Sequence, residues 1–352
     1  MGKNGRVVRT GAVAAALVSG VTFGAVAGGP SLSAVASPAA GLPAECAEVR
    51  DAVERLEGDI TPNACAFMRR QIAFGEIPTG TPPQAGEVTH PRVQAYLDIF
   101  DPEATLWEAG SAPQRGHGVI GTSIIGSLGL VPDLRYAGRD VVADGAVVMF
   151  GQWNDATIKG HKVSYPQIAR NVLSDDGKSI QARRYYDRVT VFGPAAPELR
   201  NLFDGVADPA HSPGDIPEAV QPARFAAAEI TARLAAWNGE DATALTERMR
   251  GGRLNGPGLA TPLTTAEGQA DYLNRLFAHG RFELKAGQAA FGRTTAYVEW
   301  HGTVTTLANE KVSFGIVERF GPDGEWELTF DTLPLVADQA AIRTLYQRLA
   351  QP

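Results

Sequence analysis

A long internal repeat constrains the fold of this chain more than any other feature of its sequence. Residues Val163–Arg170 reappear, with changes, as Val312–Arg319. In both copies a tryptophan lies about ten residues upstream, an Asp-Gly turn follows, and a strand pattern then ends on an aromatic residue and an aspartate. The matching features are Trp153 and Trp300, Asp176-Gly177 and Asp323-Gly324, and Tyr186-Asp187 and Phe330-Asp331. An offset of about 145 residues is that of a whole domain, since solenoid units repeat every 20 to 50 residues or so. We therefore expect one fold to be present twice.

Length and charge limit the class of protein. The chain has 352 residues, which is room for about two domains that each bury a core. Its formal net charge is -7, and it contains no run of Lys or Arg. These properties argue against nucleic acid, or an anionic membrane surface, as a partner.

The first 36 residues have the features of an export signal. A positively charged start is followed by small apolar residues from 11 to 29 and by a small-residue cleavage site at Ala34–Ala36, with Ala25–Ala27 as the alternative site. A membrane anchor is the competing interpretation, but the apolar stretch is short and interrupted by Gly, whereas a span needs about 20 predominantly apolar residues. We expect a signal peptide at 1–36, a secreted mature protein and no stable membrane span.

Export makes the two cysteines informative. Cys46 and Cys65 are the only cysteines in the chain, and an even number in an oxidising compartment predicts a disulfide bond. Cys46 begins a short amphipathic pattern that predicts a helix as far as Leu56, and Thr61-Pro62 is typical of the start of a second helix. The bridge would then join a helical hairpin. The alternative is two free thiols.

Composition divides the chain into five segments. After the signal peptide, we expect a disulfide-stapled hairpin and connector at 37–91, a first domain at 92–193, a Pro-rich linker at 194–222 and a second domain at 223–352. In each domain helical patterns come first and a run of strands follows, which is the α+β pattern. The predicted helices are 92–100, 116–129, 223–237, 242–249, 265–278 and 337–349. The predicted strands are 140–142, 146–154, 162–173, 180–192, 281–286, 294–305, 310–320 and 326–330.

Four segments resemble the nuclear-transport-factor-like fold, and within it the SnoaL-like polyketide cyclase group. They are Phe100–Trp107, Ala235–Ala242 and the two aromatic-Asp strand ends. The resemblance covers about two thirds of the chain. It implies an α+β fold of two tandem cone-shaped domains, each a curved antiparallel sheet packed on helices with a deep apolar pocket. It also implies that Arg115 and His117 line the pocket rim. Trp107, at the end of the first of these segments, is an expected substrate-binding residue together with His117. Members of the group include dehydratases, isomerases, cyclases and epoxide hydrolases, and others are non-catalytic, so the fold does not determine the function.

One candidate catalytic pair lies at the end of a strand in the first domain. Side chains alternate between the two faces of a strand, so Tyr185 and Asp187 share one face. There Asp187 could act as a general base and Tyr185 could donate a hydrogen bond to a developing oxyanion. The alternative is that Asp187 only ends the strand or pairs with a neighbouring arginine.

The second domain offers a different candidate set. Glu299 and His301 share a strand face and could form an acid–base pair, with Asp331 approaching from the last strand. The alternative is a polar strand face turned toward water. The first domain has Gln152 and Asn154 at the corresponding positions, which can bind a substrate but cannot transfer a proton at neutral pH. With Trp153 and Trp300 they complete the expected substrate-binding residues.

These residues predict a cofactor-independent enzyme that acts on a small hydrophobic molecule. The reaction would be that of an isomerase, cyclase, dehydratase or epoxide hydrolase, with a carboxylate as acid or base. The alternative is an exported, non-catalytic binding protein for an apolar small molecule or a partner protein. No metal-ligand spacing occurs in the sequence, so no metal is expected. A second copy of the chain, in a homodimer, is an alternative partner.

Overall fold

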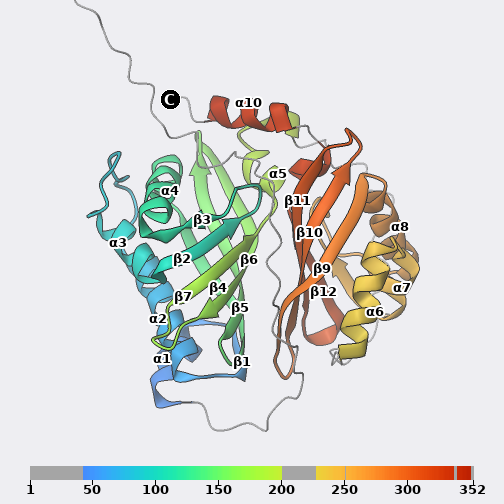
Figure 1. Cartoon of the computed structure of the whole chain (residues 1–352), viewed down its shortest axis with the longest axis horizontal. Coiled ribbons are helices and arrows are strands. Elements are labelled where there is room, and N and C mark those ends of the chain that lie inside the picture. Colours follow the sequence, from blue (N-terminus) through green and yellow to red (C-terminus); the bar gives the residue numbers. More distant parts are fainter. Residues whose placement is uncertain (1–42, 200–226, 250, 337–338, 350–352) are drawn as a thin grey trace, which may run out of the picture.

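The computed structural model describes residues 43–199, 227–249, 251–336 and 339–349. It contains two domains, each with helices on one side of a curved sheet. Figure 1 shows the two sheets side by side at the centre of the molecule, with one set of helices on each outer side. The predicted signal peptide at 1–36 and most of the linker predicted at 194–222 lie outside the described residues.

Domain one contains a sheet of seven strands. Their order is β1-β4-β5-β6-β7-β2-β3. The central strands pair antiparallel as predicted, while β1 pairs parallel with β4, and β2 with β7. These parallel pairs differ from the expected antiparallel sheet because helical segments separate the paired strands in the chain. The strands are β1 (Arg55–Asp59), β2 (Phe100–Glu108), β3 (Gln114–Arg115), β4 (Arg135–Asp144), β5 (Val147–Ile158), β6 (His161–Leu173) and β7 (Ser179–Tyr185).

The helices of domain one cover one face of this sheet. Together they bury a continuous apolar core. They are η2 (Ala44–Cys46), α1 (Ala47–Ala52), α2 (Pro62–Glu76), α3 (Pro91–Asp98) and α4 (Gly116–Leu130), and α5 (Arg188–Phe192) and η3 (Pro197–Leu199) follow the last strand. The hydroxyl of Thr61 accepts a hydrogen bond from the backbone N–H of Ala64, as expected of a helix cap.

The Cys46–Cys65 disulfide is confirmed, and it joins η2 to α2. The helix predicted as far as Leu56 is shorter than expected, because α1 ends at Ala52 and the next residues enter β1. Since β1 pairs with β4, the segment expected to form a separate hairpin belongs to the sheet and core of domain one.

Domain two repeats this plan with fewer strands. Its sheet has the order β8-β12-β11-β10-β9, and only β8 pairs parallel. The strands are β8 (Arg253–Asn255), β9 (Gly280–Phe291), β10 (Ala296–Thr306), β11 (Lys311–Phe320) and β12 (Glu325–Phe330). The helices are α6 (Ala227–Asn238), α7 (Ala242–Glu247), α8 (Ala266–Phe277), η4 (Pro322–Gly324), α9 (Leu333–Val336) and α10 (Gln339–Leu349).

The sequence repeat corresponds to strands β6 and β11. Each pairs antiparallel with the preceding strand, and Gln152 lies opposite Gln167 as Trp300 lies opposite Ile316. The duplication of the strands is thus present, but the predicted match of individual residues on β5 and β10 is wrong by one position. Trp300 corresponds to Gln152 and not to Trp153, so Gln152 and Asn154 do not correspond to Glu299 and His301. A shift of one residue places the side chains on opposite faces of the sheet.

The sheet faces opposite the helices pack against each other. Their apolar contact is formed by Val142, Met149, Ile168, Tyr185, Ala290, Tyr297 and Val317. Small residues allow the close approach: a Cβ atom on Gly315 would lie 2.7 Å from Cε1 of Tyr185. In each sheet, therefore, one face lies against helices and the other faces the partner sheet. None of the helices in the described ranges is both long and apolar enough to span a bilayer.

Candidate functional site

A cavity lies inside domain one, between the sheet and the helices. Its volume is about 140 Å³. A cavity of about 150 Å³ can hold a benzene molecule, so this space fits a ligand with one small ring. Aromatic lining residues are Phe74, Tyr96, Tyr136, Phe150, Tyr165, Tyr186 and Phe192, and polar ones include Gln71, Glu108, Gln152, Asn154, Gln167, Asn171 and Arg184.

Two asparagine side chains in the cavity wall carry unused hydrogen-bond donors. Asn154 is 2% exposed and Asn171 is 3% exposed. The Oδ1 atom of Asn154 accepts from Gln152 at 2.7 Å, and Oδ1 of Asn171 accepts from Ser179 at 3.1 Å. Both Nδ2 groups are buried without a hydrogen-bond partner among the described residues. Because an unsatisfied buried donor is costly, such groups are expected to meet a ligand or an ordered water.

One ion pair lies in the same wall. Nη1 of Arg184 donates to Oε1 of Glu108 at 3.3 Å, and the guanidinium lies 4.9 Å from the ring centre of Tyr96. Burial raises the pKa of Tyr96 and of Tyr165, so both phenols stay protonated and can donate hydrogen bonds. Burial opposes the charge of Arg184, but Tyr96 and Glu108 outweigh it and raise the pKa of the guanidinium. The wall therefore offers neutral donors beside one paired carboxylate.

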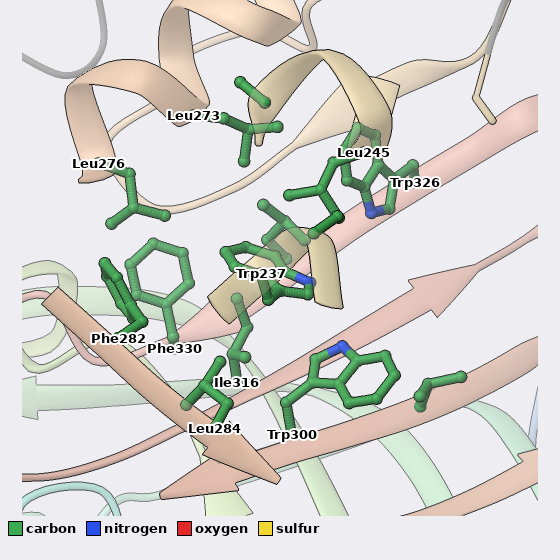
Figure 2. Close-up of a cluster of buried hydrophobic side chains, with 14 of the residues drawn as sticks. Trp237, Leu245, Leu273, Leu276, Phe282, Leu284, Trp300, Ile316, Trp326 and Phe330 are labelled. Atoms are coloured by element: carbon green, nitrogen blue, oxygen red, sulfur yellow. The ribbon is translucent and has the colours of Figure 1, made fainter. Parts of the chain in front are cut away.

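The aligned register explains why domain one is hollow. When β6 is aligned with β11 through the sequence repeat, the strand pairing matches two sets of residues. Gln152, Gln167 and Ala169 of domain one correspond to Trp300, Ile316 and Glu318 of domain two. The first set is small or polar, whereas the second includes a large indole and a carboxylate that fill the same volume. Figure 2 shows the interior of domain two packed with aromatic and aliphatic side chains.

The two predicted strand-end carboxylates lie at the domain interface. Asp187 caps α5 and accepts hydrogen bonds from N and Oγ1 of Thr332, at 3.0 and 2.5 Å. Asp331 accepts from N and Nε of Arg188, at 3.1 and 2.6 Å. Burial and the charge of Asp331 raise the pKa of Asp187. Both carboxylates are outside the domain-one cavity. Asp187 lines a separate cleft of about 240 Å³ between the domains.

Glu299 is also at the interface and not in a pocket of its own domain. Nε of Arg170 donates to both of its oxygens, at 3.1 and 3.2 Å, and Arg183 and the Tyr185 hydroxyl also donate to it. Although burial opposes ionisation, the two arginines lower the pKa of Glu299 to about 2. His301 follows on the same strand face, where burial and Arg183 lower its pKa to about 4. The Tyr185 hydroxyl therefore donates its hydrogen bond to Glu299 across the interface, and not to Asp187, its predicted partner.

Of the expected substrate-binding residues, Gln152 and Asn154 line the cavity and the others do not. Trp107 packs on Tyr185, with ring centres 5.5 Å apart, and Trp300 lies in the core of domain two. Trp153 is 42% exposed and lines the inter-domain cleft. The Nε2 atom of His117 lies 3.0 Å from the carbonyl oxygen of Phe100.

Several residues of the cavity were not predicted from the sequence. They include Glu108, Gln167, Asn171 and Arg184. Gln167, Ala169 and Asn171 alternate along β6 at a spacing that would have placed them on one face. In the described ranges, no three His, Cys, Asp or Glu side chains lie close enough to hold a metal ion.

No family model and no curated protein matches the chain, but several solved structures do. TerC co-crystallised with polyporic acid is 14% identical, with a TM-score of 0.32, over 39% of this chain and 99% of that one. An NTF2-like protein of unknown function from Burkholderia pseudomallei is 12% identical, with a TM-score of 0.31, over 38% and 98%. A protein with a ketosteroid isomerase-like fold from Catenulispora acidiphila, in complex with trimethylamine, is 16% identical, with a TM-score of 0.31, over 39% and 95%. The chain is similar to these proteins in fold, and the similarity indicates no reaction.

Proposed function

We propose that domain one binds a small ring-containing molecule in its cavity and that domain two serves as a scaffold. The unpaired Nδ2 groups of Asn154 and Asn171 carry this proposal, because they require an acceptor that the described residues do not provide. The aromatic lining favours an apolar ring, and the amide donors favour a ligand with a carbonyl or hydroxyl oxygen at its edge. The disulfide supports the expectation that the protein works outside the cytoplasm.

Calorimetric titration with a panel of single-ring ketones, phenols and quinones tests this proposal. Asn154→Leu and Asn171→Leu should each weaken the binding of an acceptor-bearing compound about 10-fold, the effect of roughly one hydrogen bond. Ala169→Leu should abolish binding, because it fills the cavity. Asn274→Leu is the control, since Asn274 is exposed on α8 in the other domain. Equal affinities in all four variants would place the site elsewhere.

Glu108 favours a second candidate function, which is acid–base catalysis in the same cavity. It is the one carboxylate among the described lining residues, and Arg184 fixes its position. A carboxylate that removes a proton, beside protonated tyrosines that donate hydrogen bonds to the developing negative charge, suits an isomerase, cyclase, dehydratase or epoxide hydrolase without a cofactor. Glu108→Gln should then reduce turnover by a factor of roughly 10² to 10⁴ while ligand binding persists. Wild-type protein that binds compounds of the panel and converts none of them would exclude catalysis.

A further inference from the structure

A second polar cluster lies in the middle of domain two, far from any solvent. Glu318 is 0% exposed, and its carboxylate accepts a hydrogen bond from each of three tryptophan Nε1 atoms. The distances are 2.7 Å from Trp237, 2.6 Å from Trp300 and 2.8 Å from Trp326. Figure 2 shows these three indoles converging from α6, β10 and β12. Three neutral donors stabilise the carboxylate but leave its charge without a counterion.

Arg233 of α6 supplies that counterion. Its Nε donates to both oxygens of Glu318, at 2.9 and 2.8 Å, and Nη2 donates as well. Nη1 donates to the carbonyl oxygen of Leu245 at 3.2 Å. The guanidinium carbon also lies 4.9 Å from the ring centre of Trp326 and 5.1 Å from that of Phe320. The guanidinium, in a residue 1% exposed, thus has a carboxylate, a carbonyl and two aromatic faces around it.

This arrangement has the composition of a ligand-binding site. A planar guanidinium matches a carboxylate with two parallel hydrogen bonds and stacks on aromatic rings, whereas an ammonium ion does neither. Arg233 reaches this site from a helix, while the strands provide Glu318, Trp300 and Trp326. In the aligned register Glu318 occupies the position of Ala169, which lines the cavity of domain one.

We infer that the interior of domain two is a guanidinium-binding site and that Arg233 is its tethered ligand. The site is selective for small guanidinium compounds, and it becomes available to them when the Arg233 side chain is removed. Arg233→Ala deletes a fragment with the composition of ethylguanidinium. It leaves Glu318 as a buried charge without a counterion.

Thermal unfolding of the full chain tests this inference with ethylguanidinium chloride as the probe. Low millimolar ethylguanidinium should raise the melting temperature of Arg233→Ala saturably, and it should leave the wild type unchanged because Arg233 occupies the site. Propylammonium chloride at the same concentration should have no effect on either protein. Arg233→Met, which fills the space without a charge, and Arg233→Ala/Glu318→Gln, which removes the carboxylate charge, should not respond to ethylguanidinium.

Equal shifts in the wild type and in Arg233→Ala, or an equal response to propylammonium, would overturn the inference. Should Arg233→Ala unfold in plain buffer, the same comparison is made on refolding yield. Recovery with ethylguanidinium alone supports the site, and no recovery, or recovery with both salts, refutes it.

Discussion

Arg170 and Arg319 occupy equivalent positions in the two sheets, and each binds a carboxylate of the other domain. Arg170 binds Glu299, and Arg319 binds Asp140 with Nε 2.6 Å from Oδ2. Both arginines end their copy of the sequence repeat. The strand-end residues reciprocate in the same way, because Asp187 binds Thr332 while Asp331 binds Arg188. The duplication has thus produced a nearly two-fold interface within one chain.

Breaking one of these buried pairs should be strongly destabilising. Glu299→Gln leaves Arg170 and Arg183 without their carboxylate, and we expect a loss of roughly 3 to 5 kcal/mol in the free energy of unfolding. Arg170→Met/Glu299→Leu removes both charges and should lose less than Glu299→Gln. Lys311→Gln, which breaks an exposed pair with Glu283, should change stability by about 1 kcal/mol or less. Urea denaturation measures all three, and equal losses from Glu299→Gln and Lys311→Gln would contradict the interface described above.

The close approach of the sheets gives a prediction at Gly315. A methyl group there would lie 2.7 Å from Cε1 of the buried Tyr185 ring, so Gly315→Ala must push the sheets apart. We expect a loss of about 1 to 3 kcal/mol, as for other overpacked cores. Gly129→Ala is the control, because it lies in α4 with open space around its Cβ and should stabilise the helix by up to about 1 kcal/mol. If both substitutions stabilise the protein, the sheets are not in contact at Gly315.

The sequence predicted the framework better than the site. The duplication, the disulfide and most helices and strands could be predicted, because periodicity, cap residues and cysteine number are local signals. Alternation of polar and apolar residues along a strand could not show what each of its two faces packs against. In this protein both faces are buried, one against helices and one against the other sheet.

This ambiguity explains the different fates of the candidate residues. Tyr185 and Glu299 are polar residues, and their positions on the strands fit a pocket or an interface equally well. They meet at the interface through a contact between residues about 115 positions apart in the sequence. Gln152 and Asn154 lie on the face toward the helices and do line a cavity. Only the packing of the sheets distinguishes the two cases.

His301 should make stability depend on pH. Its pKa is about 4 in the folded protein, because of burial and the charge of Arg183, and about 6.5 in an unfolded chain. The unfolded state therefore binds the proton more readily. This contribution to stability is complete above pH 6.5 or so and is lost as the pH falls toward about 4. The free energy of unfolding of His301→Gln should fall less over this range than that of the wild type. His161→Gln, at the exposed first residue of β6, should follow the wild type, and parallel curves for all three proteins would exclude the effect.

The disulfide should contribute through the unfolded chain. Cys46 and Cys65 are 19 residues apart, and closing a loop of that length stabilises a protein by about 3 kcal/mol on the chain-entropy model. Cys46→Ser/Cys65→Ser should lose about this amount in urea denaturation. Reductant should lower the stability of the wild type and leave the double variant unchanged. Thiol titration of unreduced, denatured protein should find no free thiol, and two reactive thiols would refute the bridge.

The last helix of domain two shares an apolar cluster with two residues that line the cavity of domain one. Ile342 and Leu345 of α10 pack in one apolar cluster with Val191 and Phe192, which line the cavity. Figure 1 shows α10 above α5, at the end of the molecule where this cluster lies. Because α5 is short, we expect its position to depend on that contact. Leu345→Ala removes buried methyl groups, and we expect a local loss of roughly 2 to 5 kcal/mol.

Hydrogen exchange should therefore become faster in the backbone amides of α5 while those of α2 keep their protection. A compound that binds the cavity should also dissociate faster from Leu345→Ala. Leu284→Ala, in the core of domain two, serves as the matched control, because it loses the same group and lines neither the cavity nor the inter-domain cleft. If both variants change α5 and α2 alike, the loss is global and α10 has no specific role over the cavity.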